Sequence, residues 1–261
     1  MMDKMRSKDM KKILLQLAAA ITFFTRLPLW KLLEIPSESF KKIICFWPLT
    51  GWITAGFTAL AWLAFSMIFP PILAVILAFG CKVLLTGGLH EDGLGDFFDG
   101  FGGGRTKEDV LRIMKDSHVG SYALIGMIFY YLLLINTVVS IPKEMTAIAI
   151  FAADPFSKML TALMMNMLPY ARTEQESKSK TLFEKLSPGR LISILIFGLL
   201  PIILLLEVKL CLTVLLPIAT VIFVFFLAKK RIGGYTGDIC GATALLCELS
   251  FYLSFYVVLK L

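Results

Sequence analysis

No charged side chain occurs in residues 43–81, and this apolar run restricts the fold of the chain more than any other feature. At about 1.5 Å per residue, a helix of this length is too long for one crossing of a hydrocarbon core about 30 Å thick. Pro70 and Pro71 interrupt the run, so it predicts two membrane helices joined by a tight turn. The composition agrees, because 17% of the residues are charged, compared with about 25% in soluble domains.

Five further apolar runs predict five further membrane spans. They comprise residues 119–142, 145–168, 191–206, 210–228 and 239–259. Residues 13–25 form a shorter apolar run that follows five basic residues, and they predict an in-plane or re-entrant helix. We therefore expect an all-α, polytopic integral membrane protein with about seven transmembrane helices plus this N-terminal helix, in a single membrane domain that covers residues 1–261.

The basic residues are concentrated on one side of the predicted spans. Of the 26 lysine and arginine residues, 21 fall in residues 1–42, 86–118, 170–190 and 229–238. By the positive-inside rule, these four segments are predicted to face the cytoplasm from the cytoplasmic membrane. Because this topology accounts for the net charge of +7, we expect a lipid bilayer as a partner, and no nucleic acid.

Residues 86–118 are predicted to form a cytoplasmic catalytic segment that is rich in glycine and acidic residues. Asp92, Asp96 and Asp99 recur at positions i, i+4 and i+7, so a helix would place them on one face. Such like charges repel unless a cation neutralises them, and carboxylates suit Mg²⁺, which proteins usually hold with one or two carboxylates plus substrate phosphates. A solvated acidic turn is the alternative, but the glycines permit close approach of a ligand and the segment adjoins a span end.

Two other features lie on the same predicted side of the membrane. Thr106 and Asp109 predict a capping box that begins an amphipathic helix, on which Arg112 and Lys115 could reach phosphate groups. A solvated helix face is the alternative for these two basic residues. Residues 233–238 form a second glycine-rich turn with an acidic residue, immediately before the last span.

Three ionisable residues fall inside predicted spans, where a charge is costly. Asp154 and Lys158 are four residues apart on one helix face, and we expect them to neutralise each other. Glu248 lies within the last span, and its position makes it a functional candidate by default. We nevertheless predict that all three contribute to packing and not to turnover.

The acidic segment and its neighbours resemble the cobalamin synthase family, the adenosylcobinamide-GDP ribazoletransferases. The resemblance rests on residues 86–96, Asp99 with Gly100, residues 113–117, Gly120, residues 24–28 and residues 233–238. It implies a Mg²⁺-dependent late step of cobalamin biosynthesis, in which a hydroxyl of α-ribazole, or of its 5'-phosphate, attacks the cobinamide-linked phosphorus of adenosylcobinamide-GDP and releases GMP. The chain departs from the family pattern at Glu91, His118 and Lys158.

The resemblance also implies roles for individual residues. The three aspartates 92, 96 and 99 are the expected catalytic residues, and together with Glu91 they are the expected metal ligands. The expected substrate-binding residues are Arg26, His90, Arg112, Lys115, Asp116, Ser117, Thr236, Gly237 and Asp238.

Two other classes of protein compete with this interpretation. A CDP-alcohol phosphotransferase also places aspartates at a span end, but its signature has Ala-Arg where Gly95 and Asp96 stand here. A transporter is favoured by the ionisable residues inside spans and disfavoured because the sequence shows no internal repeat. The sequence leaves open whether the protein is an oligomer.

Overall fold

The computed structural model describes residues 2–172, 185–205 and 207–261, and every regular element within them is a helix. The α-helices are α1 (Met2–Phe24), α2 (Ser37–Phe40), α3 (Trp47–Phe65), α4 (Pro71–Thr86), α5 (Leu89–Gly103), α6 (Lys107–Ile113), α7 (Ser121–Ser140), α8 (Lys143–Met167), α9 (Pro188–Leu205), α10 (Leu215–Ile232) and α11 (Gly237–Lys260). Three short 3₁₀ helices are η1 (Leu29–Lys31), η2 (Ile43–Phe46) and η4 (Val208–Val214). The predicted all-α fold is confirmed.

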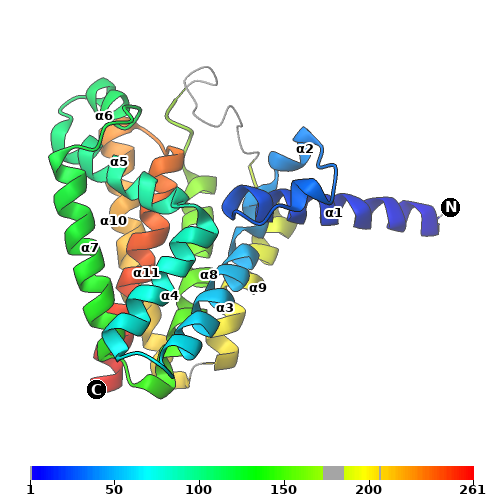
Figure 1. The fold of residues 1–261 in the computed structure, drawn as a ribbon. Coiled ribbons are helices and arrows are strands. Elements are labelled where there is room, and N and C mark those ends of the chain that lie inside the picture. The colour runs from blue at the N-terminus through cyan, green and yellow to red at the C-terminus, as the bar shows by residue number, and fades with distance from the viewer. Residues whose placement is uncertain (1, 173–184, 206) are drawn as a thin grey trace.

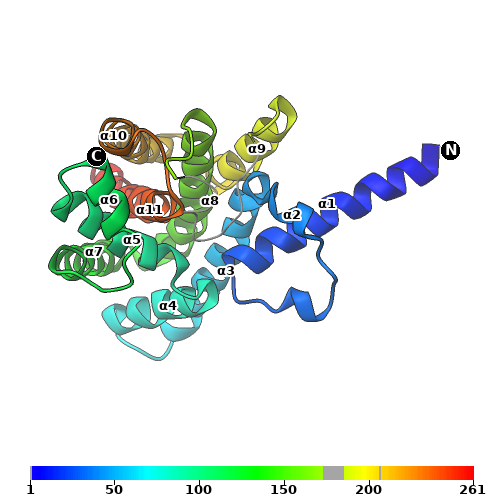
Figure 2. The same cartoon turned by 90° about the horizontal axis from the view of Figure 1, so that it is seen from above.

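Helix α11 lies at the centre of the bundle. It packs against α5, α7, α8, α10 and η4, and Figure 2 shows it enclosed by these α-helices. Apolar and small side chains surround nearly its whole circumference, as expected for a helix buried on all sides. Helix α8 is the second buried helix, because it lies between α11, α3 and α9.

In the part of the chain that the structure describes, five helical stretches are long and apolar enough to cross a membrane: Ile43–Phe65, Ser121–Ser140, Lys143–Met167, Val208–Ile232 and Gly237–Lys260. Helices α4 and α5 make a sixth candidate if they form one broken span, since they meet at a bend of 94°. The apolar part of α9, Pro188–Leu204, is shorter than these. The polytopic membrane fold is therefore confirmed, with five to six candidate spans by length and composition where about seven were expected.

The predicted hairpin at Pro70 and Pro71 is present, because α3 ends at Phe65 and α4 begins at Pro71. The N-terminal helix is longer than expected, since α1 extends over Met2–Phe24. Figure 1 shows α1 projecting sideways from the bundle, an arrangement compatible with an in-plane helix.

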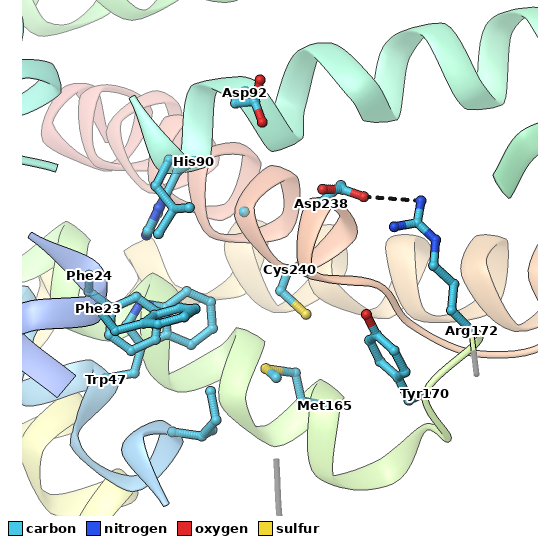
Figure 3. Close-up of a pocket in the computed structure, with 14 residues that line it drawn as sticks. Phe23, Phe24, Trp47, His90, Asp92, Met165, Tyr170, Arg172, Asp238 and Cys240 are labelled. Atoms are coloured by element: carbon cyan, nitrogen blue, oxygen red, sulfur yellow. Dashed lines mark ion pairs between the residues drawn. The ribbon is translucent and has the colours of Figure 1, made fainter. Parts of the chain in front are cut away.

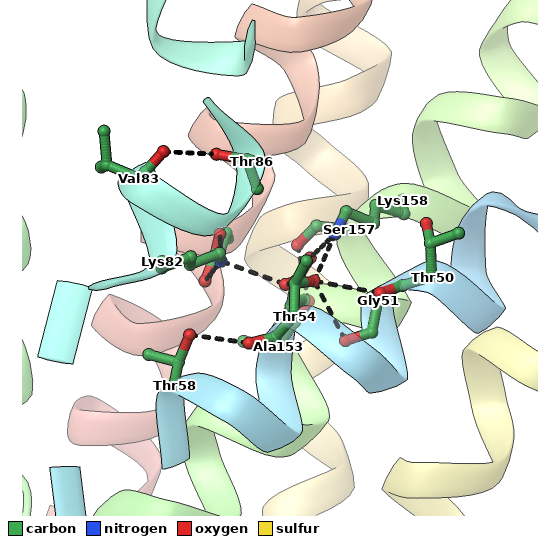
Figure 4. A network of polar contacts seen from close by, with 12 residues as sticks. Thr50, Gly51, Thr54, Thr58, Lys82, Val83, Thr86, Ala153, Ser157 and Lys158 are labelled. Atoms are coloured by element: carbon green, nitrogen blue, oxygen red, sulfur yellow. Dashed lines mark hydrogen bonds and ion pairs between the residues drawn. The ribbon is translucent and has the colours of Figure 1, made fainter. Parts of the chain in front are cut away.

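Four charged residues form a buried network in the bundle interior, and Figure 4 shows it from close by. The Lys158 ammonium lies 2.7 Å from Asp154 Oδ1, so the predicted pairing of these two residues is confirmed. Lys82 of α4 joins them at 3.1 Å from Asp154 Oδ2, and it also pairs with Glu248 of α11. Thr54 donates to Asp154 and accepts from Lys158. The two lysines balance the two acids, which reduces the cost of placing charges inside a membrane.

Candidate active site

The acidic helix α5 owes its direction to two glycines. Gly87 and Gly88 both adopt left-handed backbone conformations, with φ angles of 70° and 71°, which only glycine adopts without strain. They end α4 and turn the chain into α5 at the bend of 94°. The side chain of Arg26 lies against Gly87, where any side chain would clash with its guanidinium. The bend therefore carries α5 across the end of the bundle, beside the N-terminus of α11 (Figure 1).

Close backbone contact brings α5 and α11 together at the site. A Cβ atom at Gly93 would lie 2.8 Å from the carbonyl oxygen of Asp238, so this position has room only for glycine. The turn before α11 is held in place by Tyr235, whose N–H donates to Pro169 and whose carbonyl accepts from the N–H of Ala171. Asp92 and Asp238 consequently line the same pocket, although they are far apart in the sequence.

The pocket has a volume of about 160 Å³ and is lined by residues from α1, η2, α3, α5, α8 and α11, with Tyr170 and Arg172. Figure 3 shows that it has a charged end and an aromatic end. The charged end is formed by Asp92, Asp238 and Arg172, which were brought together from three segments.

Arg172 organises the charged end. Its guanidinium lies 3.4 Å from Asp238 Oδ2 and donates to the carbonyl oxygen of Leu111, also at 3.4 Å. Its side chain is buried, so the guanidinium is held in one position. Asp92 is exposed, and its carboxylate makes no hydrogen bond or ion pair with the described part of the chain. This arrangement leaves one carboxylate available to a ligand beside a positioned cation.

The aromatic end is formed by Phe24, Trp47 and His90. The rings of Phe24 and Trp47 stack, with centroids 5.0 Å apart and an interplanar angle of 7°. His90 meets the Trp47 ring edge-on at 5.8 Å and the Phe24 ring edge-on at 6.3 Å. The His90 side chain is 5% exposed, and neither of its ring nitrogens has a hydrogen-bond partner in the described residues.

A second cavity, of about 600 Å³, adjoins the pocket and shares Tyr170 and Arg172 with it. Lys107, Arg112 and Lys115 contribute to its walls, so we call it the basic groove. These residues belong to α6 and the turn after it, and the predicted capping box of Thr106 and Asp109 is confirmed at the start of α6. The predicted substrate residues Arg112 and Lys115 therefore lie close to the pocket.

Asp99, a predicted metal ligand, has a structural contact that Asp92 does not have. Asp92 is exposed, whereas the Asp99 carboxylate, two turns further along α5, is buried against the start of α7. Oδ2 accepts from the N–H of Gly120 at 2.6 Å, and Oδ1 accepts from the N–H of Ala123 at 2.9 Å. Both oxygens are thus engaged with backbone donors that would otherwise be unsatisfied at a helix N-terminus. We assign Asp99 to anchoring α7.

The other predicted site residues are distributed around the pocket. His90, Gly237 and Asp238 line it, whereas Thr236 caps α11 by accepting from the N–H of Ile239. Glu91 and Asp96 lie on α5 beside the pocket-lining residues. Arg26 is exposed at the bend.

Asp116 and Ser117 are exposed in the turn that follows α6, and neither lines the pocket or the groove. Asp116 accepts from the ring of His118 at 2.6 Å. This hydrogen bond lowers the pKa of Asp116 below its ordinary value and raises the pKa of His118 above its own.

The charged end fits a magnesium ion. No group of three or more histidine, cysteine or acidic residues that could hold a metal occurs in the described residues. Magnesium, however, is usually held by one or two carboxylates and completed by substrate phosphates and water. Asp92 and Asp238 provide two hard carboxylate donors in one pocket. Asp92 is exposed and makes no hydrogen bond or ion pair in the described chain, so it is the more accessible of the two donors.

The comparisons with known proteins identify the family of the chain. The family described as cobalamin-5-phosphate synthase matches residues 16–256. Proteins from Shewanella sp. (strain W3-18-1) and Shewanella putrefaciens, both named adenosylcobinamide-GDP ribazoletransferase, are each 37% identical over 245 residues, which cover 92% of either chain. The protein of that name from Shewanella oneidensis is 34% identical over 243 residues. No solved structure matches the chain. The resemblance seen in the sequence is confirmed, and the chain belongs to the cobalamin-5-phosphate synthase family.

Proposed function

We propose that this transferase joins adenosylcobinamide-GDP to α-ribazole, or to α-ribazole 5'-phosphate, and releases GMP. The product is adenosylcobalamin or its 5'-phosphate, so the reaction is a late step of cobalamin biosynthesis. The names of the relatives support these substrates. The observation that carries the proposal is the pocket in which Asp92, Asp238 and Arg172 meet between an aromatic end and a basic groove. This arrangement suits a substrate pair that combines an aromatic base with a diphosphate.

The reaction needs one bond to form and one to break. A ribose hydroxyl oxygen of α-ribazole bonds to the cobinamide-linked phosphorus, and the bond from that phosphorus to the oxygen bridging to GMP breaks. GMP leaves with this oxygen, and the hydroxyl proton passes to a carboxylate. Asp92 is our candidate for the acceptor, because it lines the pocket without a partner in the described chain.

Phosphoryl transfer of this kind depends mainly on positioning and on charge stabilisation. We propose that Asp92 and Asp238 hold magnesium, with Asp96 one helical turn from Asp92. When bound, the ion would neutralise charge on the phosphate oxygens. Arg172 lies at the boundary between the pocket and the basic groove, where its buried guanidinium can bind two oxygens of one phosphate. Arg112 and Lys115 would hold the phosphates that belong to the departing GMP.

The proposed site faces the cytoplasm from the cytoplasmic membrane. The basic segments 1–42, 86–118 and 229–238 support this orientation through the positive-inside rule. The turn before α11 and helix α6 lie at the same end of the bundle as α5 (Figure 1). Substrates would therefore enter from the cytoplasm.

GMP release tests the proposal. Purified protein in detergent, supplied with Mg²⁺, adenosylcobinamide-GDP and α-ribazole, should produce GMP and a cobalamin in equal amounts. Omission of α-ribazole should abolish GMP release, which separates transfer from hydrolysis. Substitution of CDP-activated alcohols for adenosylcobinamide-GDP provides the control for the rival phosphotransferase class. Absence of GMP from the complete mixture would contradict the proposal.

A further inference from the structure

We infer that the aromatic end of the pocket binds the benzimidazole base of α-ribazole, with His90 donating a hydrogen bond to the unsubstituted ring nitrogen. This inference rests on the proposed function, because it assigns one of the two substrates to one part of the same site. His90, Trp47 and Phe24 are the residues that carry it, and Figure 3 shows them together on one side of the pocket.

The size and lining of the pocket suit an apolar bicyclic ring. A volume of about 160 Å³ is comparable to the apolar cavities of about 150 Å³ that admit benzene. Beyond the aromatic residues, Ile44, Met165 and Cys240 contribute to its walls. Offset or edge-on contact with the aromatic side chains favours a flat aromatic ligand.

The two substrate bases differ in what they require from such a pocket. Guanine carries several donors and acceptors, each of which costs free energy when it is buried without a partner. The base of ribazole has one ring nitrogen bound to ribose and one unsubstituted ring nitrogen, which is only an acceptor. The aromatic end therefore matches the ribazole base better than it matches guanine.

His90 supplies the one polar contact that this base needs. Both of its ring nitrogens are buried without a partner in the described chain, a costly state that a bound ligand would relieve. A neutral imidazole has one N–H donor, which can bond the unsubstituted nitrogen of the base.

The position of His90 is fixed by its surroundings. A Cβ atom at Gly241 would lie 3.2 Å from the His90 Cα, so α11 packs directly on the backbone of α5 at this point. The edge-on contacts with Phe24 and Trp47 restrict the imidazole plane. A base held there places its ribose towards Asp92, Asp238 and Arg172, where the proposed transfer takes place.

A riboside of indole tests the hydrogen bond without any change to the protein. Indole has the same shape as benzimidazole, but a C–H group replaces the unsubstituted nitrogen. We expect the wild-type protein to bind the indole riboside roughly tenfold more weakly than the benzimidazole riboside, as measured by isothermal titration calorimetry. Equal affinity for the two ribosides would overturn the inference.

Substitution of each histidine in turn then tests whether His90 donates the hydrogen bond to the base. In His90→Leu, the affinity for the benzimidazole riboside should fall roughly tenfold and the preference over the indole riboside should disappear. His118→Leu is the matched control, since His118 is the only other histidine and is exposed outside the pocket. It should keep the wild-type preference. Thermal unfolding of both variants in detergent identifies any loss of fold.

The inference and the proposed function fail in different ways. If the protein binds α-ribazole through His90 but releases no GMP, the proposed function is wrong and the base site stands. The second case is that GMP is released, but His90→Leu raises the KM for adenosylcobinamide-GDP and leaves the KM for α-ribazole unchanged. The guanine then occupies the aromatic end, and the inference is wrong. Calorimetry with α-ribazole alone supplies the binding result whether or not turnover occurs.

Discussion

The ammonium nitrogen of Lys82 lies 2.5 Å and 2.6 Å from the two carboxylate oxygens of Glu248, so a buried ion pair joins α4 to α11. Tyr252 donates to the same carboxylate at 2.8 Å. Helix α4 leads into α5, and α11 begins at the site. The pair therefore joins the helix that leads into the Asp92 segment to the helix that carries Asp238.

Removal of Lys82 alone should strongly destabilise the protein. Lys82→Met leaves Glu248 and Asp154 buried with one lysine between them, and a broken buried pair costs about 3–5 kcal/mol of the free energy of unfolding. Adding Glu248→Gln to Lys82→Met should recover part of that loss, because the stranded carboxylate is then neutral. Thermal unfolding of the purified variants in detergent measures both effects.

Lys209→Met is the matched control for Lys82→Met, since Lys209 is exposed and undergoes the same chemical change. It should alter the free energy of unfolding by no more than about 0.5 kcal/mol. Simple addition of the losses in Lys82→Met and Glu248→Gln would show that the two side chains do not interact.

Asp92→Asn should separate catalysis from stability. The Asp92 carboxylate is exposed and has no partner in the described chain, so its neutralisation should leave the unfolding temperature unchanged. If Asp92 holds the metal or accepts the hydroxyl proton, kcat should fall about 10²-fold or more. GMP release at varied Mg²⁺ is the measurement, and Glu144→Gln, an exposed acid on the first turn of α8, is the control. Near-normal turnover of Asp92→Asn at limiting Mg²⁺ would exclude both roles.

Asp99→Asn should lower the stability of the protein and leave kcat nearly unchanged, the reverse of what we expect for Asp92→Asn. The substitution replaces one acceptor oxygen with an amide donor that faces the backbone N–H groups of Gly120 and Ala123. The loss of this cap should cost about 1–2 kcal/mol of the free energy of unfolding. At temperatures where the variant remains folded, its kcat should stay close to that of the wild type. A large loss of kcat with unchanged stability would instead return Asp99 to the metal site.

Local sequence patterns predicted the elements whose partners lie nearby in the chain. The tandem prolines predicted the hairpin between α3 and α4, and Thr106 with Asp109 predicted the capping box, because each signal acts within a few residues. The pairing of Asp154 with Lys158 was predictable for the same reason, since residues four apart on a helix share one face.

Contacts between distant segments were not predictable from one sequence. The periodicity placed Asp92 and Asp99 on one helix face, but the packing of α7 against α5 decides which of them is buried. Nothing in the sequence distinguishes Arg172 as a site residue, because a basic residue beside a span end usually reflects topology. Phe24 and Trp47 look like ordinary core residues in a chain as apolar as this one.

The predicted topology places Glu108 and Met67 on opposite sides of the membrane. Glu108 lies in the first turn of α6, beside the basic groove, and Met67 lies in the hairpin between α3 and α4. Both side chains are exposed, so a cysteine at either position should react with a membrane-impermeant maleimide that can reach it. In intact cells we expect labelling of Met67→Cys and none of Glu108→Cys until the cells are permeabilised. Cys211→Ser should be present in both variants and in the control chain, because Cys211 is partly exposed in η4. Labelling of Glu108→Cys in intact cells would reverse the orientation and place the proposed site outside the cytoplasm.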